Sequence, residues 1–174
     1  MKAHFLCCCE CNPELHLYFK AHHQHKCSHY LTDLKQLLRG YGPCLVHHGT
    51  CDVREDLHNV DLMIGGPSCY PWAGSRDKGK GAVSGKQGLA KDHPDFDMTF
   101  SDYFDLTDMY HPKGGIVEQV DGFANENEEC LIEFGYDSYC QMFCARLRSR
   151  GCLVRALMLS MATWSKVPRN RTPD

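Results

Sequence analysis

The stretch VDLMIGGPSCYPW, residues 60–72, decides the predicted fold and raises the question of function. Its first seven residues indicate a buried strand that ends in the glycine pair Gly65–Gly66. Cys69 follows two residues after Pro67, so a single thiol stands directly beyond the end of a strand. That position is where open α/β sheets bind ligands, and it makes Cys69 a candidate nucleophile as well as a candidate core residue.

Outward from this stretch, short apolar runs alternate with segments of helical periodicity. We expect four strands and three helices; the strands cover residues 4–10, 60–66, 114–122 and 152–161, and the helices cover residues 13–23, 30–40 and 138–151. The alternation predicts an α/β fold with a largely parallel sheet, in which Glu10, Cys69 and Glu118 meet at one edge.

Composition narrows the class of protein. The chain has 174 residues, enough for one domain with a sizeable core, and its net charge of −3 excludes a globally basic nucleic-acid binder. No run approaches the length of a membrane span, and the N-terminus has no signal-peptide pattern. We expect an intracellular protein, nuclear if the organism is eukaryotic, with no membrane partner.

The twelve cysteines invite two other interpretations. A secreted disulfide scaffold is disfavoured because Cys7–Cys8–Cys9 has no regular disulfide spacing. A zinc site in CCCEC or HHQH lacks the second ligand pair that structural sites use, so we expect no metal site. The triple cysteine instead indicates a strand whose thiols pack as small apolar groups. A redox or metal protein using these thiols remains the third alternative.

Residues 73–95 form one long glycine-rich stretch with weak periodicity. A stretch of this length is either a solvated loop or a functional lid. We expect its cations to contact the DNA backbone if it is a lid; they are Arg76, Lys78, Lys80 and Lys86.

Taken together, these motifs resemble those of the cytosine-C5 DNA methyltransferases. That family has Gly-x-Pro-Cys-x-Pro-aromatic after a strand, here GGPSCYPW; Glu-Asn-Val ending another strand, here EQV at residues 118–120; and Val-Pro-Gln-x-Arg, here VPRNR at residues 167–171. The resemblance runs from about Phe5 to Arg171. It implies a Rossmann-like sheet that binds S-adenosylmethionine and acts on DNA.

The resemblance also implies roles for single residues. Cys69 would attack C6 of a flipped cytosine, Glu118 would bind N3 and the exocyclic amine, and Arg171 would contact the base carbonyl or orient Glu118. Glu10 would hold the cofactor's ribose. Asp52 would reach the adenine, with Asp33 as the competing candidate.

The chain departs from the family pattern at Ser68, Tyr70, Gln119 and Arg169. The family's first strand with its glycine-rich cofactor loop, and its target-recognition region, have no counterpart in residues 1–174, so we expect a partial catalytic domain whose sheet is incomplete at both ends. The expectation is that this chain alone transfers no methyl group. The alternative is a catalytically inactive fragment that binds only DNA or a protein.

Overall fold

A computed structural model describes residues 4–58, 60–72 and 90–157. The described residues divide into two compact units: the first holds residues 4–71, apart from residue 59, together with residues 90–119, and the second holds Trp72 and residues 120–157. All the helices and strands that carry the predicted site residues of the described part lie in the first unit.

The larger sheet of the first unit is mixed. Its strands are β1 (Phe5–Cys9), β2 (Cys27–Leu31), β3 (Tyr41–Cys44) and β4 (Gly49–Asp52), in the order β1-β2-β3-β4. β1 and β2 are parallel, whereas β3 is antiparallel to both β2 and β4. The prediction of a largely parallel sheet is therefore wrong for this part, because two short strands after α2 (Leu34–Arg39) form a hairpin that the sequence analysis did not anticipate.

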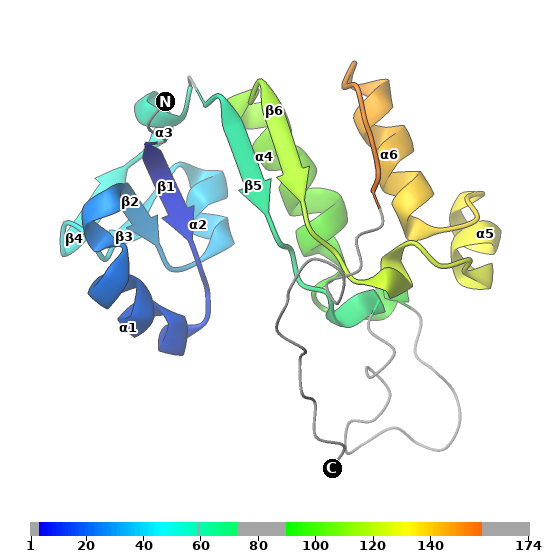
Figure 1. Ribbon diagram of the computed structural model, residues 1–174, viewed down its shortest axis with the longest axis horizontal. Helices are drawn as coiled ribbons and strands as arrows, with labels where there is room; N and C mark the ends of the chain where they lie inside the picture. The colour runs from blue at the N-terminus through cyan, green and yellow to red at the C-terminus, as the bar shows by residue number, and fades with distance from the viewer. Residues whose placement is uncertain (1–3, 59, 73–89, 158–174) are drawn as a thin grey trace, which may run out of the picture. The chain divides into compact units, whose positions relative to one another are not determined.

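The second sheet is a parallel pair formed by β5 (Leu62–Gly65) and β6 (Gly114–Val117), which pair from Leu62↔Gly114 to Gly65↔Val117. Both strands were predicted from their apolar runs, as was β1. In Figure 1 the arrows of β1, β5 and β6 point the same way, so their carboxyl ends face one side of the first unit. An α/β architecture is confirmed, with one mixed and one parallel sheet.

Helix ends follow local capping chemistry. Asn12 caps α1 (Pro13–His22) by accepting from the Glu14 N–H at 3.0 Å, and Asp33 caps α2 by accepting from the Lys35 N–H at 2.9 Å. α2 ends at Gly40, whose φ of +77° is the left-handed conformation that a helix end favours. Both helices were predicted, although Tyr30 and Leu31 belong to β2 and not to the second helix.

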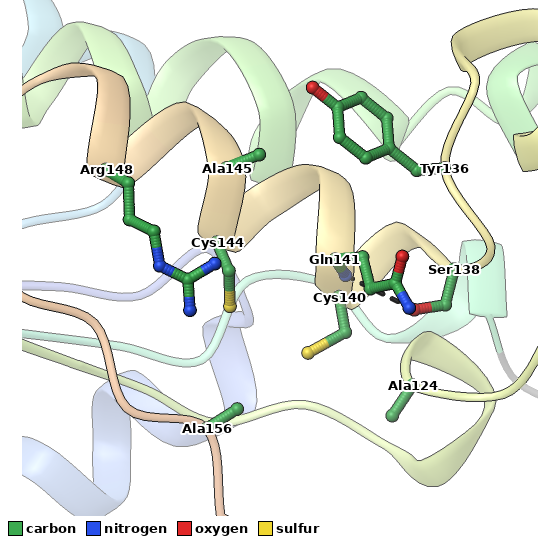
Figure 2. A pocket seen from close by; sticks show the side chains of 9 residues that line it. All are labelled: Ala124, Tyr136, Ser138, Cys140, Gln141, Cys144, Ala145, Arg148 and Ala156. Atoms are coloured by element: carbon green, nitrogen blue, oxygen red, sulfur yellow. Dashed lines mark hydrogen bonds between the residues drawn. The ribbon is translucent and has the colours of Figure 1, made fainter.

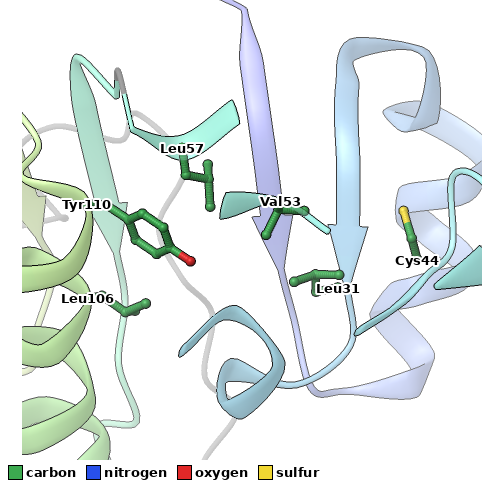
Figure 3. Close-up of a cluster of buried hydrophobic side chains, with 6 residues drawn as sticks. All are labelled: Leu31, Cys44, Val53, Leu57, Leu106 and Tyr110. Atoms are coloured by element: carbon green, nitrogen blue, oxygen red, sulfur yellow. The ribbon is translucent and has the colours of Figure 1, made fainter. Parts of the chain in front are cut away.

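A buried cluster joins β2, the hairpin and two further helices, α3 (Arg54–Leu57) and α4 (Tyr103–Tyr110). Figure 3 shows its members, which are Leu31, Cys44, Val53, Leu57, Leu106 and Tyr110. Leu31 and Val53 are fully buried. The Tyr110 hydroxyl donates to the Leu37 carbonyl at 2.7 Å, so the ring also ties α4 to α2. This cluster is the core of the first unit.

The triple cysteine lies in β1 as predicted. Burial raises the pKa of Cys9 to about 12 and raises the pKa of Cys7 as well, so both stay protonated near neutral pH. Neutral, partly buried thiols behave as small apolar side chains. All twelve cysteines are free thiols in the structure.

The second unit contains α5 (Glu128–Phe134), α6 (Tyr139–Ser149) and a cluster of aromatic side chains. The Trp72 ring packs against Phe123 and Tyr139, with ring centroids 5.1 and 4.7 Å apart. α6 was predicted. The strand expected over residues 152–161 is not formed over 152–157, because these residues pair with no strand of the described chain and Leu153 is fully exposed.

The remaining short helical turns connect these elements. They are the 3₁₀ turns Gln24–Lys26, Tyr70–Trp72, Ala90–Asp92 and Asp121–Phe123, and the π-helical turn Met98–Asp102 that leads into α4. Across the part of the chain with described coordinates, no helix combines the length and apolarity needed to span a membrane.

Gly40→Ala is expected to destabilise the first unit by about 2–4 kcal/mol. The left-handed φ penalises any Cβ, and a Cβ here would also collide with the Arg54 side chain. Gly135→Ala is the matched control: Gly135 ends α5 with φ +74° but has open space around it, so only the backbone penalty of about 1–2 kcal/mol applies. Urea unfolding, followed by hydrogen exchange in α2 and α5, measures the loss of stability in each variant. Equal losses would contradict the steric account.

Candidate active site

The carboxyl ends of β5 and β6 are joined by backbone and side-chain hydrogen bonds. The Glu118 N–H donates to the Gly65 carbonyl at 3.0 Å, and Gln119 Nε2 donates to the Pro67 carbonyl at 2.9 Å. A Cβ on Gly66 would lie 3.7 Å from Glu118 Oε2, so the carboxylate reaches the backbone of the loop that carries Cys69. Two of the three predicted strand-end residues therefore come from adjacent segments.

Cys69 is half-buried, and both of its neighbours are held by one segment, residues 93–95. The Ser68 hydroxyl donates to Asp95 Oδ2 at 2.6 Å, and the Tyr70 ring stacks on His93 with centroids 6.3 Å apart. His93 Nδ1 in turn accepts from the Asp95 N–H at 3.1 Å. Hydrogen bonding and stacking on either side of the thiol restrain the loop that presents it.

The sequence analysis missed His93 and Asp95 as parts of this site. The sequence offered one signal for these two residues, their position at the end of the long polar stretch. That position does not reveal a contact with residues more than 20 positions away. Ser68 and Tyr70, two of the departures from the family motif, are the residues that make these contacts. A proline at position 68 has no hydroxyl to donate to Asp95.

Glu10 lies at the carboxyl end of β1, as predicted, and is half-buried. Its Oε1 accepts from the Asn12 N–H at 2.8 Å, and its carbonyl bonds His16 Nε2 at 2.6 Å. The side chain thus closes the turn from β1 into α1. It stands in the same unit as Cys69 and Glu118, at the end of a strand that points the same way (Figure 1).

Asp52 and Asp33, the two candidates for an adenine contact, both have local partners. Asp33 caps α2 through Lys35. Asp52 pairs with the Arg54 guanidinium and also accepts from the Arg54 N–H at 3.0 Å. These hydrogen bonds lower the pKa of Asp52 from its ordinary 3.8 to about 2.

Arg54→Ala is expected to raise the pKa of Asp52 part of the way back to its ordinary value, because the guanidinium is lost while the backbone N–H of residue 54 still donates to the carboxylate. Because the carboxylate form is favoured in the folded chain, the contribution of this pair to stability is present above about pH 4 and is lost as the pH falls towards 2. Carboxyl carbon NMR titration of the two proteins measures the shift. An unchanged midpoint for Asp52 would show that Arg54 is not its cause.

The other predicted site residues lie outside the described residues. They are Arg171 and the DNA-contact candidates Arg76, Lys78, Lys80 and Lys86. The structure therefore tests neither the predicted lid nor the arginine motif.

A pocket of about 470 Å³ lies in the second unit (Figure 2). Successive turns of α6 contribute Cys140, Cys144 and Arg148 to its wall, and Ser138 lines it at the start of that helix. Burial raises the pKa of Cys140, and the neighbouring Cys144 adds to the rise, so the Cys140 thiol stays protonated near neutral pH. The pocket does not contain a residue that the sequence analysis assigned to catalysis.

A separate group of potential metal ligands occurs on β2 and the β3–β4 hairpin. It consists of His29, Cys44, His47 and Cys51. The sequence analysis weighed zinc only at CCCEC and HHQH and expected no metal site. The spacing Cys44-x2-His47-x3-Cys51 was the signal that could have drawn attention to this group.

Comparison of the chain with protein-family models, curated proteins and solved structures finds no match to any of them.

Proposed function

We propose that this chain carries the catalytic core of a cytosine-C5 DNA methyltransferase, with Cys69 as the nucleophile and Glu118 as the group that binds the pyrimidine. The observation that carries the proposal is the pairing of β5 with β6, which brings the Glu118 carboxylate to the loop of Cys69. The sequence motifs around both residues, and their order in the chain, support the same assignment.

The reaction needs a nucleophile because C5 of cytosine does not attack a methyl donor unaided. The Cys69 thiolate would form a bond to C6, which makes C5 nucleophilic, while Glu118 supplies a proton to N3. S-adenosylmethionine supplies the methyl group when bound. Loss of the C5 proton to a base then returns the electron pair that expels the thiolate and regenerates Cys69, and N3 gives its proton back to the Glu118 carboxylate, which restores the neutral ring.

A flipped base fits this arrangement because a thiol on a strand-end loop is out of reach of a stacked cytosine. Asp95 and His93 would act as positioning residues, since they restrain Ser68 and Tyr70 on either side of the nucleophile. Arg171 would contact the base or orient Glu118. Arg76, Lys78, Lys80 and Lys86 would bind the DNA phosphates.

The cofactor would lie at the end of β1, next to Glu10. Glu10 Oε1 is taken by the Asn12 N–H, which leaves Oε2 as an acceptor for a ribose hydroxyl. Asp52 can reach an adenine amine only if its pairing with Arg54 is shared or released. The observed fold is α/β, and we propose that it is of the Rossmann-like methyltransferase type. The parallel pairs β1–β2 and β5–β6 support this assignment.

The test is covalent capture of DNA by the full chain. A duplex with 2-pyrimidinone at the target position accepts a thiolate without a methyl donor, because the ring lacks the exocyclic amine and is more electrophilic. We expect a denaturation-resistant adduct whose cross-linked peptide contains Cys69. A duplex with 5-fluorocytosine, incubated with S-adenosylmethionine, reports methyl transfer, since fluorine at C5 blocks the final elimination.

The two probes separate the outcomes. Capture of 2-pyrimidinone alone supports the nucleophile and shows no methyl transfer under these conditions. Capture of both supports the nucleophile and shows that the chain also binds the cofactor productively. DNA binding with no adduct, or an adduct at another cysteine, would overturn the assignment and favour an inactive binding module.

A further inference from the structure

Four side chains with metal-binding atoms converge on β2 and the β3–β4 hairpin. His29 comes from the middle of β2, Cys44 ends β3, His47 lies in the turn and Cys51 lies in β4. One potential ligand atom from each residue lies within 4.8 Å of all the others. Two sulfurs and two imidazole nitrogens form the donor set of structural zinc sites.

The spacing of these atoms is close to that of a coordinated ion. His47 Nδ1 lies 3.1 Å from Cys51 Sγ and 3.5 Å from Cys44 Sγ. In a tetrahedral site with ordinary Zn–S and Zn–N bond lengths, ligand atoms are about 3.3–3.8 Å apart. Separations of at most 4.8 Å therefore need to shrink by no more than about 1–1.5 Å for all four atoms to bind one ion.

His29 is oriented as a metal ligand would be. Its Nε2 bonds Asp56 Oδ2 at 2.9 Å, while its buried Nδ1 has no hydrogen-bond partner among the described residues. A carboxylate on one ring nitrogen fixes the tautomer and directs the other nitrogen to the metal, as in the carboxylate–histidine–zinc arrangement. Without an ion, the unpaired buried nitrogen is an unfavourable feature.

The sulfur of Cys44 has a comparable supporting contact. The Tyr30 N–H donates to Cys44 Sγ at 3.4 Å, and Cys44 itself is buried. An N–H donor stabilises a metal-bound thiolate. His47 is exposed, so the site has a path by which an ion can enter.

We propose that His29, Cys44, His47 and Cys51 bind one structural zinc ion, with Asp56 orienting His29. Binding of Zn²⁺ would release the two thiol protons and leave a site of zero net charge, which suits a partly buried position. The proposal goes beyond the proposed function and does not depend on it. Soft, tetrahedral S₂N₂ coordination favours zinc over magnesium or calcium.

The ion would hold the hairpin to the rest of the sheet. β2 and β3 share one register pair, Leu31↔Cys44, which is joined by the backbone bond from the Leu45 N–H to the Tyr30 carbonyl at 2.9 Å. Ligands on β2, β3 and β4 would cross-link the three strands at this weak junction. Zinc binding should therefore stabilise the folded chain by mass action.

The experiment uses the full chain, unfolded with chelator and reductant and then refolded with or without Zn²⁺. We expect one zinc per chain by elemental analysis, a higher melting temperature with zinc, and a tetrahedral thiolate spectrum when Co²⁺ replaces zinc. X-ray absorption should report two sulfurs and two nitrogens. Cys51→Ser should abolish the Co²⁺ spectrum.

A pair of single variants and one double variant make the result decisive. Asp56→Asn changes an exposed side chain and should weaken zinc binding about 10–100-fold. The neighbouring Glu55→Gln should leave the affinity unchanged. Cys9→Ser combined with Cys11→Ser removes the thiols that the sequence emphasised and should preserve the Co²⁺ spectrum. The proposal fails if zinc does not bind stoichiometrically, if Asp56→Asn binds as tightly as Glu55→Gln, or if the Cys9/Cys11 variant loses the spectrum.

Discussion

Cys69→Ser is expected to abolish covalent capture of 2-pyrimidinone DNA, a fall of about 10⁴-fold in rate, the scale seen when a triad member is removed from a hydrolase. A thiolate adds readily to an electron-poor ring, whereas a serine hydroxyl is almost never ionised at neutral pH. The substitution is close in size, and Cys69 is only half-buried, so the fold should tolerate it. Denaturing gel electrophoresis after timed incubation measures the rate.

Cys11→Ser is the matched control, since Cys11 is an exposed thiol of the same unit that should form no adduct. This variant should therefore capture DNA as fast as the unaltered chain. Glu118→Gln should retain the thiol and slow capture by about 10²–10⁴-fold, the usual contribution of a general acid. If Cys69→Ser captured DNA as fast as the unaltered chain, the nucleophile would have to be another residue.

Leu31→Ala is expected to lower the free energy of unfolding by about 2–5 kcal/mol. Leu31 is fully buried at the centre of the cluster in Figure 3. The smaller side chain leaves a cavity that the surrounding Val53 and Tyr110 fill only in part. Because β2 also carries His29, we expect this variant to weaken zinc binding as well. Urea unfolding in the presence of zinc measures the loss.

Leu17→Ala is the matched control for this core position. Leu17 lies on α1 of the same unit with 74% of its surface exposed, so its truncation should change stability by less than about 0.5 kcal/mol. A similar loss of stability in both variants would mean that a partner covers Leu17 in solution. A loss near zero at Leu31 would mean that this cluster is not the core of the folded chain.

Elements with a strong local signal were predictable from the sequence. α1 and α2 were predicted from helical periodicity, with Pro13 in the first turn of one helix and Gly40 at the end of the other. The structure adds the caps, Asn12 and Asp33, which were not predicted. β1, β5 and β6 were predicted because each is an apolar run bounded by polar or glycine residues. Their shared direction followed from the α/β pattern, and it placed Glu118 near the loop of Cys69.

The tertiary structure decided what depends on contacts between distant segments. β3 and β4 are four residues each, both contain a glycine and β3 also contains a proline, so they have too little periodicity to be predicted as strands. The same limit applies to residues 152–157, where an apolar run found no partner strand in the described chain. Strand pairing is a long-range property, and local composition does not determine it.

The chemistry divides in the same way. The sequence by itself determined which residues are candidates for catalysis, since Cys69 and Glu118 stand in recognisable motifs at strand ends. Only the fold determined that Ser68 bonds Asp95, that Arg54 lowers the pKa of Asp52, and that His29 meets Cys44, His47 and Cys51. The physical reason is that hydrogen bonds and metal coordination act over about 2–4 Å. Such contacts become visible only when folding has brought the segments together.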